Sequence, residues 1–315
     1  MNAVRRDAVT TSPIVVSLPR APGSGSALGL GARLTAVAPP WLLSRILTAT
    51  ASDEPDTLPA GHWHGPEVRQ GLLTATTAPA NASAIRWVHH VMGELHRQLT
   101  WLDGPPVVVV AGPPEYLDSV RWPRFEAPAR RAATAGPARY RRTLRDGLER
   151  HLVSFPDHSA PAGLGSTELA LHLAANGPRS LVDSTFQEFG IHAETAIQRS
   201  FASEGARLRW SILAQRPTGI AALETAVAAV GGYLAGPALS PPEHVRQTAV
   251  DSVRTRFGTV TELVREMVHY ELTGWSPELL LRPERELQAV GAAELGHSLD
   301  QLVQPVLQVI GASRP

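Results

Sequence analysis

The sequence has no cysteine and no lysine among its 315 residues, and each absence excludes a class of site. Without cysteine there is no disulfide, thiolate nucleophile or cysteine-ligated zinc, so a metal would need histidine and carboxylate ligands. Without lysine there is no phosphate-binding Walker loop. No run approaches the roughly 18 apolar residues of a membrane helix, and no signal-peptide core follows Arg5 and Arg6. We therefore expect a cytoplasmic protein that does not enter a membrane.

Charge is balanced, with 29 basic and 29 acidic residues, so no overall field draws the protein to nucleic acid. One stretch departs from this balance, because nine arginines but only three acidic residues lie between Arg121 and Arg150. The stretch is also rich in proline and alanine, and we interpret residues 113–147 as an interdomain linker. Such a linker could dock an acidic partner, or it could be a solvated tether without a ligand. No nucleic-acid-binding motif accompanies it.

Residues 1–112 form the first expected domain. Strands are expected at 14–18, 28–37 and 68–77, and an amphipathic helix follows whose apolar residues recur at intervals of three and four. The valine run at 107–110 then predicts a buried strand that closes the domain. Gly29 and Gly31 lack the third glycine of a dinucleotide-binding loop.

Residues 148–315 form the second expected domain. A strand at 148–155 and a helix pair precede two alternating segments around Ser203-Glu204-Gly205, which predict an antiparallel hairpin with one polar face. A capping box at 240–243 opens one long helix that reaches Met267. Residues 306–311 nearly repeat 107–112, which predicts a second closing strand and an internal duplication with a truncated first unit. The fold class is α+β, a mainly antiparallel sheet with helices on one face.

Several segments of the second domain, taken in order, resemble one domain of the pitrilysin or insulinase-type zinc metallopeptidase family, which includes the mitochondrial processing peptidase. The resemblance covers residues 148–312. It implies two similar domains, usually paired with a second such chain around an enclosed peptide-binding chamber. The segments are Leu173-Ala174-Ala175-Asn176-Gly177-Pro178-Arg179-Ser180-Leu181, Phe186-Gln187-Glu188-Phe189-Gly190-Ile191, Leu239-Ser240-Pro241-Pro242-Glu243 and Val290-Gly291-Ala292-Ala293-Glu294-Leu295.

The chain departs from the family at its catalytic motif, an inverted His-x-x-Glu-His on a helix, which occurs nowhere in the sequence. The nearest candidate set lies on the amphipathic helix of the first domain, but its histidines do not share one face within reach of a single ion. The substrate-binding Arg and Tyr of the family would fall at Phe186 and Ala193. The resemblance therefore implies a catalytically degenerate, shortened member, with zinc expected in a partner chain. The candidate set is His89, His90, Glu94 and His96.

We therefore expect a non-catalytic subunit that shapes the peptide-binding chamber of a heterodimeric peptidase, for maturation of a precursor or leader peptide. Peptide contact by strand addition is expected on the polar face of the hairpin, although an ordinary solvent face explains the same pattern. Two alternatives are a purely structural scaffold subunit and a lone metallohydrolase with zinc on His62, His64 and Glu94. The peptide-contact candidates are His192, Glu194, Gln198, Arg207 and Arg209.

Overall fold

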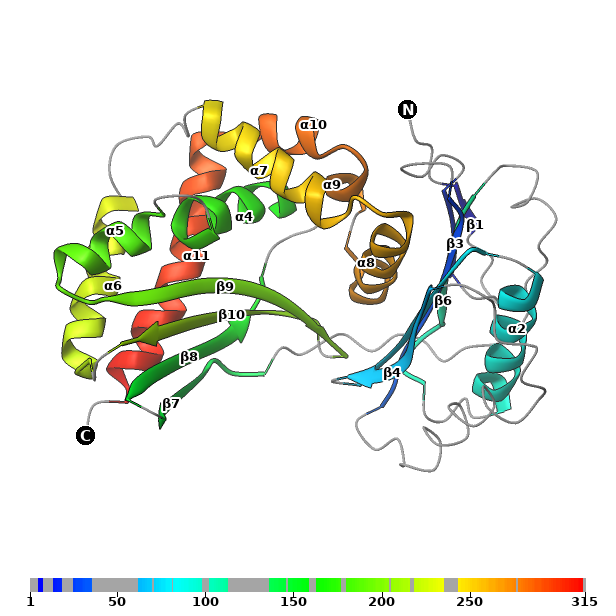
Figure 1. Cartoon of the computed structure of the whole chain (residues 1–315), viewed down its shortest axis with the longest axis horizontal. Helices are drawn as coiled ribbons and strands as arrows, with labels where there is room; N and C mark the ends of the chain where they lie inside the picture. Colours follow the sequence, from blue (N-terminus) through cyan, green and yellow to red (C-terminus); the bar gives the residue numbers. More distant parts are fainter. Residues whose placement is uncertain are drawn as a thin grey trace. The chain divides into compact units, whose positions relative to one another are not determined.

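The chain folds into two compact units, which are described separately (Figure 1). Unit 1 comprises residues 1–133, 201–203 and 255–281, and unit 2 comprises residues 134–200, 204–254 and 282–315. The computed structural model describes residues 5–7, 14–18, 25–35, 62–69, 71–80, 82–97, 102–112, 136–145, 147–158, 163–176, 180–203, 205–215, 218–234, 243–275 and 277–313. Within these residues no helix combines the length and the apolar character needed to cross a membrane.

Unit 1 is built on a six-stranded mixed sheet in the order β1-β2-β6-β3-β5-β4. Strands β2 and β6 are parallel, and the other neighbouring pairs are antiparallel. The valine run forms the buried strand β6, as predicted. The strand expected at 68–77 is instead a hairpin that turns at Gly71, whose φ is +76°. The strands are β1 Arg5–Asp7, β2 Ile14–Leu18, β3 Ala27–Arg33, β4 His62–Arg69, β5 Leu72–Ala78 and β6 Val107–Ala111.

Helices cover both faces of this sheet, whereas the sequence predicted helices on one face only (Figure 1). On one face, α2 (Ala82–Arg97) buries its apolar stripe against the even-numbered residues of β3, such as Leu28 and Leu30. On the other face lies α8 (Val260–Thr273), which contacts β3, β5 and β6. Unit 1 also includes α9 (Glu278–Leu281). The segment 255–281 was assigned to the second domain from sequence, yet its contacts place it in unit 1.

Gly29 and Gly31 make room for α8. A Cβ atom at Gly29 would lie 2.7 Å from Val264 Cγ1 and 2.8 Å from Val268 Cγ2. A Cβ atom at Gly31 would lie 2.8 Å from Leu272 Cδ1 and closer still to Val268. Since real Cβ atoms do not approach other atoms so closely, only glycine at these positions lets the helix pack directly on the strand.

Unit 2 is built on a four-stranded sheet in the order β7-β8-β10-β9, with α11 packed across it (Figure 1). The hairpin predicted around 203–205 is present as β9 and β10. The strands are β7 Arg139–Arg145, β8 Leu148–Pro156, β9 Ala193–Ala202 and β10 Gly205–Ala214. The helices are α4 Leu164–Leu171, which continues as a π-helical turn over His172–Asn176, α5 Leu181–Glu188, α6 Ile220–Leu234, α7 Glu243–Arg256, α10 Pro283–Gln288 and α11 Ala292–Gly311.

The prediction of a second closing strand at 306–311 was wrong, because these residues are the last turns of α11. The buried residues Leu295, Leu299, Leu302, Val306 and Ile310 recur at intervals of three and four, so the helical period continues through the segment. The resemblance of this segment to β6 is therefore local. The observed fold is α+β with one mixed and one antiparallel sheet, and it does not show the predicted internal duplication.

The long helix expected to reach Met267 is two helices, α7 and α8. The break lies at Gly258 and Thr259, where Thr259 Oγ1 accepts a hydrogen bond from Glu262 N at 3.2 Å and caps α8. The apolar stripe runs through the break, so periodicity alone could not reveal it. The proposed capping residues 240–242 lie outside the described residues.

The prediction of a linker at 113–147 is wrong for its last part, because Arg139–Arg145 form β7 and pair antiparallel with β8. Arg145 lies opposite Leu148, so the two strands are joined by Asp146-Gly147, and Gly147 has a φ of +75°. Asp-Gly between two strands is one of the strongest sequence signals for a hairpin. This signal was present in the sequence, but the arginine content of the segment concealed it.

Candidate functional site

The four-stranded sheet has one face covered by helices and one open face. On β9, Thr195 Oγ1 donates to Asp183 Oδ1 of α5 at 2.7 Å, and Arg199 reaches Glu168 of α4. Odd-numbered residues of β9 therefore point toward the helices, and alternation turns Glu194 and Gln198 to the open face. Both side chains are exposed.

The predicted peptide-contact residues do not all remain available. Glu194 and Gln198 are exposed, Arg209 is half-buried, and His192 is exposed immediately before β9. Arg207 is only 9% exposed. Its guanidinium donates to the carbonyl oxygens of Gly136 at 3.2 Å and Pro137 at 2.9 Å. Arg207 therefore holds the segment that leads into β7.

The open face also carries arginines that sequence reasoning assigned to the linker. Arg139, Arg141 and Arg145 alternate along β7 and are exposed, as is Arg150 on β8. Arg139 lies opposite Ser154, and Ser154 lies opposite Arg209 on β10. Because side chains opposite one another in adjacent strands share a face, these arginines lie on the same side of the sheet.

The covered face fixes β7 in place through a buried polar network. Glu149 on β8 is fully buried and pairs with Arg142 of β7, and it also accepts a hydrogen bond from Thr218 N. His151 is fully buried as well; its Nδ1 lies 2.8 Å from Tyr140 Oη, and its Nε2 lies 3.6 Å from Glu149 Oε2. Two side chains of the edge strand are thus joined to two buried side chains of its neighbour.

Burial and hydrogen bonding within this network shift the pKa values of His151, Glu149 and Tyr140. Burial lowers the pKa of His151, although the nearby Glu149 carboxylate opposes this effect. Burial alone would raise the pKa of Glu149, but hydrogen bonds from Thr218 N and Arg142 lower it overall. Burial raises the pKa of Tyr140. At neutral pH the network therefore contains a carboxylate, a neutral imidazole and a phenol.

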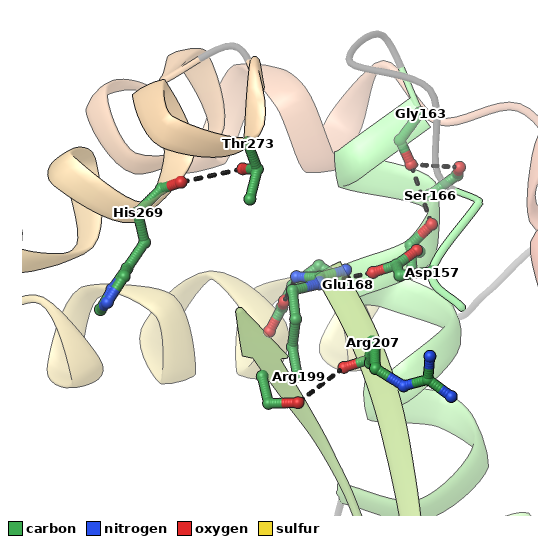
Figure 2. Close-up of polar contacts among 10 residues, drawn as sticks. Asp157, Gly163, Ser166, Glu168, Arg199, Arg207, His269 and Thr273 are labelled. Carbon is green, nitrogen blue, oxygen red and sulfur yellow. Dashed lines mark hydrogen bonds and ion pairs between the residues drawn. The ribbon is translucent and has the colours of Figure 1, made fainter. Parts of the chain in front are cut away.

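A second polar cluster joins β9 to α4 under the sheet, and Figure 2 shows Arg199 extended toward two carboxylates. Arg199 Nε donates to Asp157 Oδ2 at 2.7 Å, and Nη1 lies 3.4 Å from Glu168 Oε2. The three side chains are 7%, 1% and 9% exposed, in the order Arg199, Asp157, Glu168. A guanidinium between two buried carboxylates satisfies charges that would otherwise be costly to bury, so we assign this cluster a structural role.

Comparisons with known proteins identify the fold. No protein-family model matches the chain, and no curated protein matches its sequence. Among solved structures, a peptidase M16 inactive domain from Pseudomonas fluorescens matches with a TM-score of 0.64 at 11% identity, over 95% of this chain and 94% of that chain. Pitrilysin matches with a TM-score of 0.56 at 12% identity, over 96% of this chain and 44% of pitrilysin.

The chain has the fold of the M16 peptidases. The resemblance to pitrilysin-type peptidases predicted from the sequence is thereby confirmed for the fold. A chain of complex III2 from Candida albicans shares this fold, with a TM-score of 0.58 at 9% identity over 95% of this chain and 93% of that chain.

The described residues of this M16 fold do not fit a zinc ion. On α2, Glu94 is paired with Arg97, and His89 and His96 lie seven residues apart, or about 10 Å along the axis. His62 and His64 lie on β4 opposite Ala78 and Thr76, and their side chains lie outside the described part of the structure. Among the described residues, no group of three histidine, aspartate or glutamate side chains could hold a metal.

Proposed function

We propose that the chain is the non-catalytic subunit of a heterodimeric M16-type peptidase, paired with a homologous chain that carries the zinc motif. One observation carries the proposal: the M16 fold extends over nearly the whole chain, yet the sequence contains no His-x-x-Glu-His. The likeness to an inactive M16 domain supports the same conclusion. A chain with this combination can shape a peptide-binding chamber, while its partner supplies the metal and its activated water.

The surface that we assign to the peptide is the open face of β7-β8-β10-β9 and its edges. Strands β7 and β9 end the sheet within the described residues, so each offers backbone groups to an added strand. His192, Glu194, Gln198 and Arg209 would contact the peptide side chains. Arg207 would act only through the backbone that it holds. We expect the pair to work in a bacterial cytoplasm on a precursor or leader peptide.

Reconstitution tests the proposal. The chain would be co-expressed with a homologous chain that contains His-x-x-Glu-His, and cleavage of the precursor peptide would be followed by mass spectrometry. The pair should cleave, and neither chain should cleave alone. A pair whose zinc chain has Gln in place of the motif glutamate is the control, since it should assemble and remain inactive. Cleavage by the zinc chain alone at the rate of the pair would contradict the proposal.

A scaffold subunit without a role in peptide binding is the second candidate. The likeness to a chain of complex III2 favours it, because that chain belongs to an assembly. The same reconstitution separates the two candidates. A scaffold would form a stable complex with the zinc chain but leave its cleavage rate and its peptide affinity unchanged.

A further inference from the structure

The open face of unit 2 carries a set of arginines that we call the arginine face: Arg139, Arg141, Arg150 and Arg209. Arg150 lies opposite Thr143, which places it diagonal to Arg141 and Arg145 on β7. Diagonal neighbours of this kind stand roughly 7–8 Å apart, within reach of long side chains. The arginines are therefore close enough to act on one ligand.

The positive charge of this face is not neutralised within the described part of the chain. No ion pair there involves Arg139, Arg141, Arg150 or Arg209. The carboxylate of Glu149 points to the covered face, where it pairs with Arg142. Like charges side by side on a sheet are destabilising, so the fold carries a cost that a negatively charged ligand would remove.

The edge of β7 is held ready for an added strand. On the covered face, Arg142 is paired with Glu149, and Tyr140 is hydrogen-bonded to His151, so both partners on β8 are fully buried. These contacts fix the seven-residue strand without using Arg139, Arg141 or Arg150. A preformed edge lowers the ordering cost of strand addition.

We propose that β7 and the arginine face bind an acidic, extended segment of the peptide substrate, with Asp or Glu at alternate positions. This inference rests on the proposed function and adds a substrate class to it. A peptide strand paired with β7 places every second side chain on the open face, within about 4.5–5.5 Å of the strand residue opposite. On β7, Arg139 and Arg141 lie two residues apart on this face, and Thr143, the next residue on it, lies opposite Arg150. The match between the two periods selects alternating acids in an extended strand.

Fluorescence anisotropy on the full chain tests this inference. The probe is a labelled peptide that alternates Glu and Thr, compared with a Lys-Thr peptide and with a peptide of the same composition in which Glu and Thr are in blocks. The alternating acidic peptide should bind best. The triple variant Arg139→Gln, Arg141→Gln, Arg150→Gln should weaken it by about tenfold or more, from the loss of three partly screened ion pairs.

The matched control removes three exposed arginines elsewhere: Arg69→Gln, Arg265→Gln and Arg285→Gln. It has the same change of net charge and should leave binding within about twofold of the parent. Circular dichroism would establish that both variants are folded. The peptide N-methylated at alternate residues keeps its charge but cannot pair with an edge, so strand addition predicts that its binding is lost.

Equal binding of the Glu-Thr and Lys-Thr peptides, or equal affinities of the two triple variants, would overturn the inference. Unchanged binding of the N-methylated peptide would also overturn it. The same holds if a single-stranded oligonucleotide binds more tightly than the Glu-Thr peptide and the triple variant of Arg139, Arg141 and Arg150 abolishes that binding. These outcomes are independent of the proposed function, because binding is measured on this chain alone. If the reconstituted pair fails to cleave the precursor, the proposed function is contradicted, even if this chain binds the acidic peptide.

Discussion

Loss of Arg199 should destabilise the protein more than loss of any exposed arginine. Arg199→Met removes the guanidinium between Asp157 and Glu168 and leaves two carboxylates that are 1% and 9% exposed. Breaking a buried ion pair by removing one partner typically costs about 3–5 kcal/mol. The total stability of a domain is only about 5–15 kcal/mol, so the variant should lose a large share of it.

Urea unfolding of Arg199→Met, compared with the parent, measures this loss. Arg254→Met is the matched control, because Arg254 is 56% exposed and pairs with the exposed Glu284. That change should cost no more than about 1 kcal/mol. If both variants lose equally little stability, the reasoning about this cluster is refuted.

Gly31→Ala should lower the free energy of unfolding by about 1–3 kcal/mol, because the new methyl group meets Val268. The same change at Gly93 on α2, where a Cβ meets nothing within 4 Å, should raise it by about 0.5–1 kcal/mol; equal effects in urea unfolding would contradict the packing argument. Burial lowers the pKa of His151, so below its ordinary value of 6.5 the unfolded chain binds the extra proton. The melting temperature should therefore fall as the pH is lowered from about 7 to about 5, and it should fall less in His151→Gln. If the melting temperature of the variant depends on pH as steeply as that of the parent, His151 is not the cause of the fall.

Much of the fold was readable from periodicity. The stripe of α2, the buried valines of β6 and the alternation of β9 and β10 each repeat a single period long enough to identify an element. Errors arose where two elements share one pattern. The stripe from α7 into α8 is continuous across the break at Gly258, and the apolar end of α11 looks like a strand when taken alone.

Long-range packing could not be predicted in the same way. Gly29 and Gly31 were compared with a nucleotide-binding loop, yet their role depends on α8, more than 200 residues later in the chain. Nothing within β3 identifies which helix will lie on it. A glycine within a strand indicates a position where another part of the backbone packs closely, but it does not indicate which helix or strand packs there.

The candidate site was predicted in part. Alternation correctly placed Glu194, Gln198, Arg207 and Arg209 on one face, because the side-chain period of a strand is two. The alternation did not predict that Arg207 is buried, because the backbone segment that Arg207 contacts lies 70 residues away in sequence. The arginines of β7 were missed because composition was weighed above the Asp146-Gly147 turn signal.

The most direct test of the account measures zinc content and cleavage on one preparation of the purified pair. We predict on the order of one zinc per pair, lost together with cleavage when a histidine of the partner's motif is replaced. Replacing His62 and His64 of this chain should change neither quantity. A tightly held zinc and peptide cleavage in this chain purified alone would contradict the account.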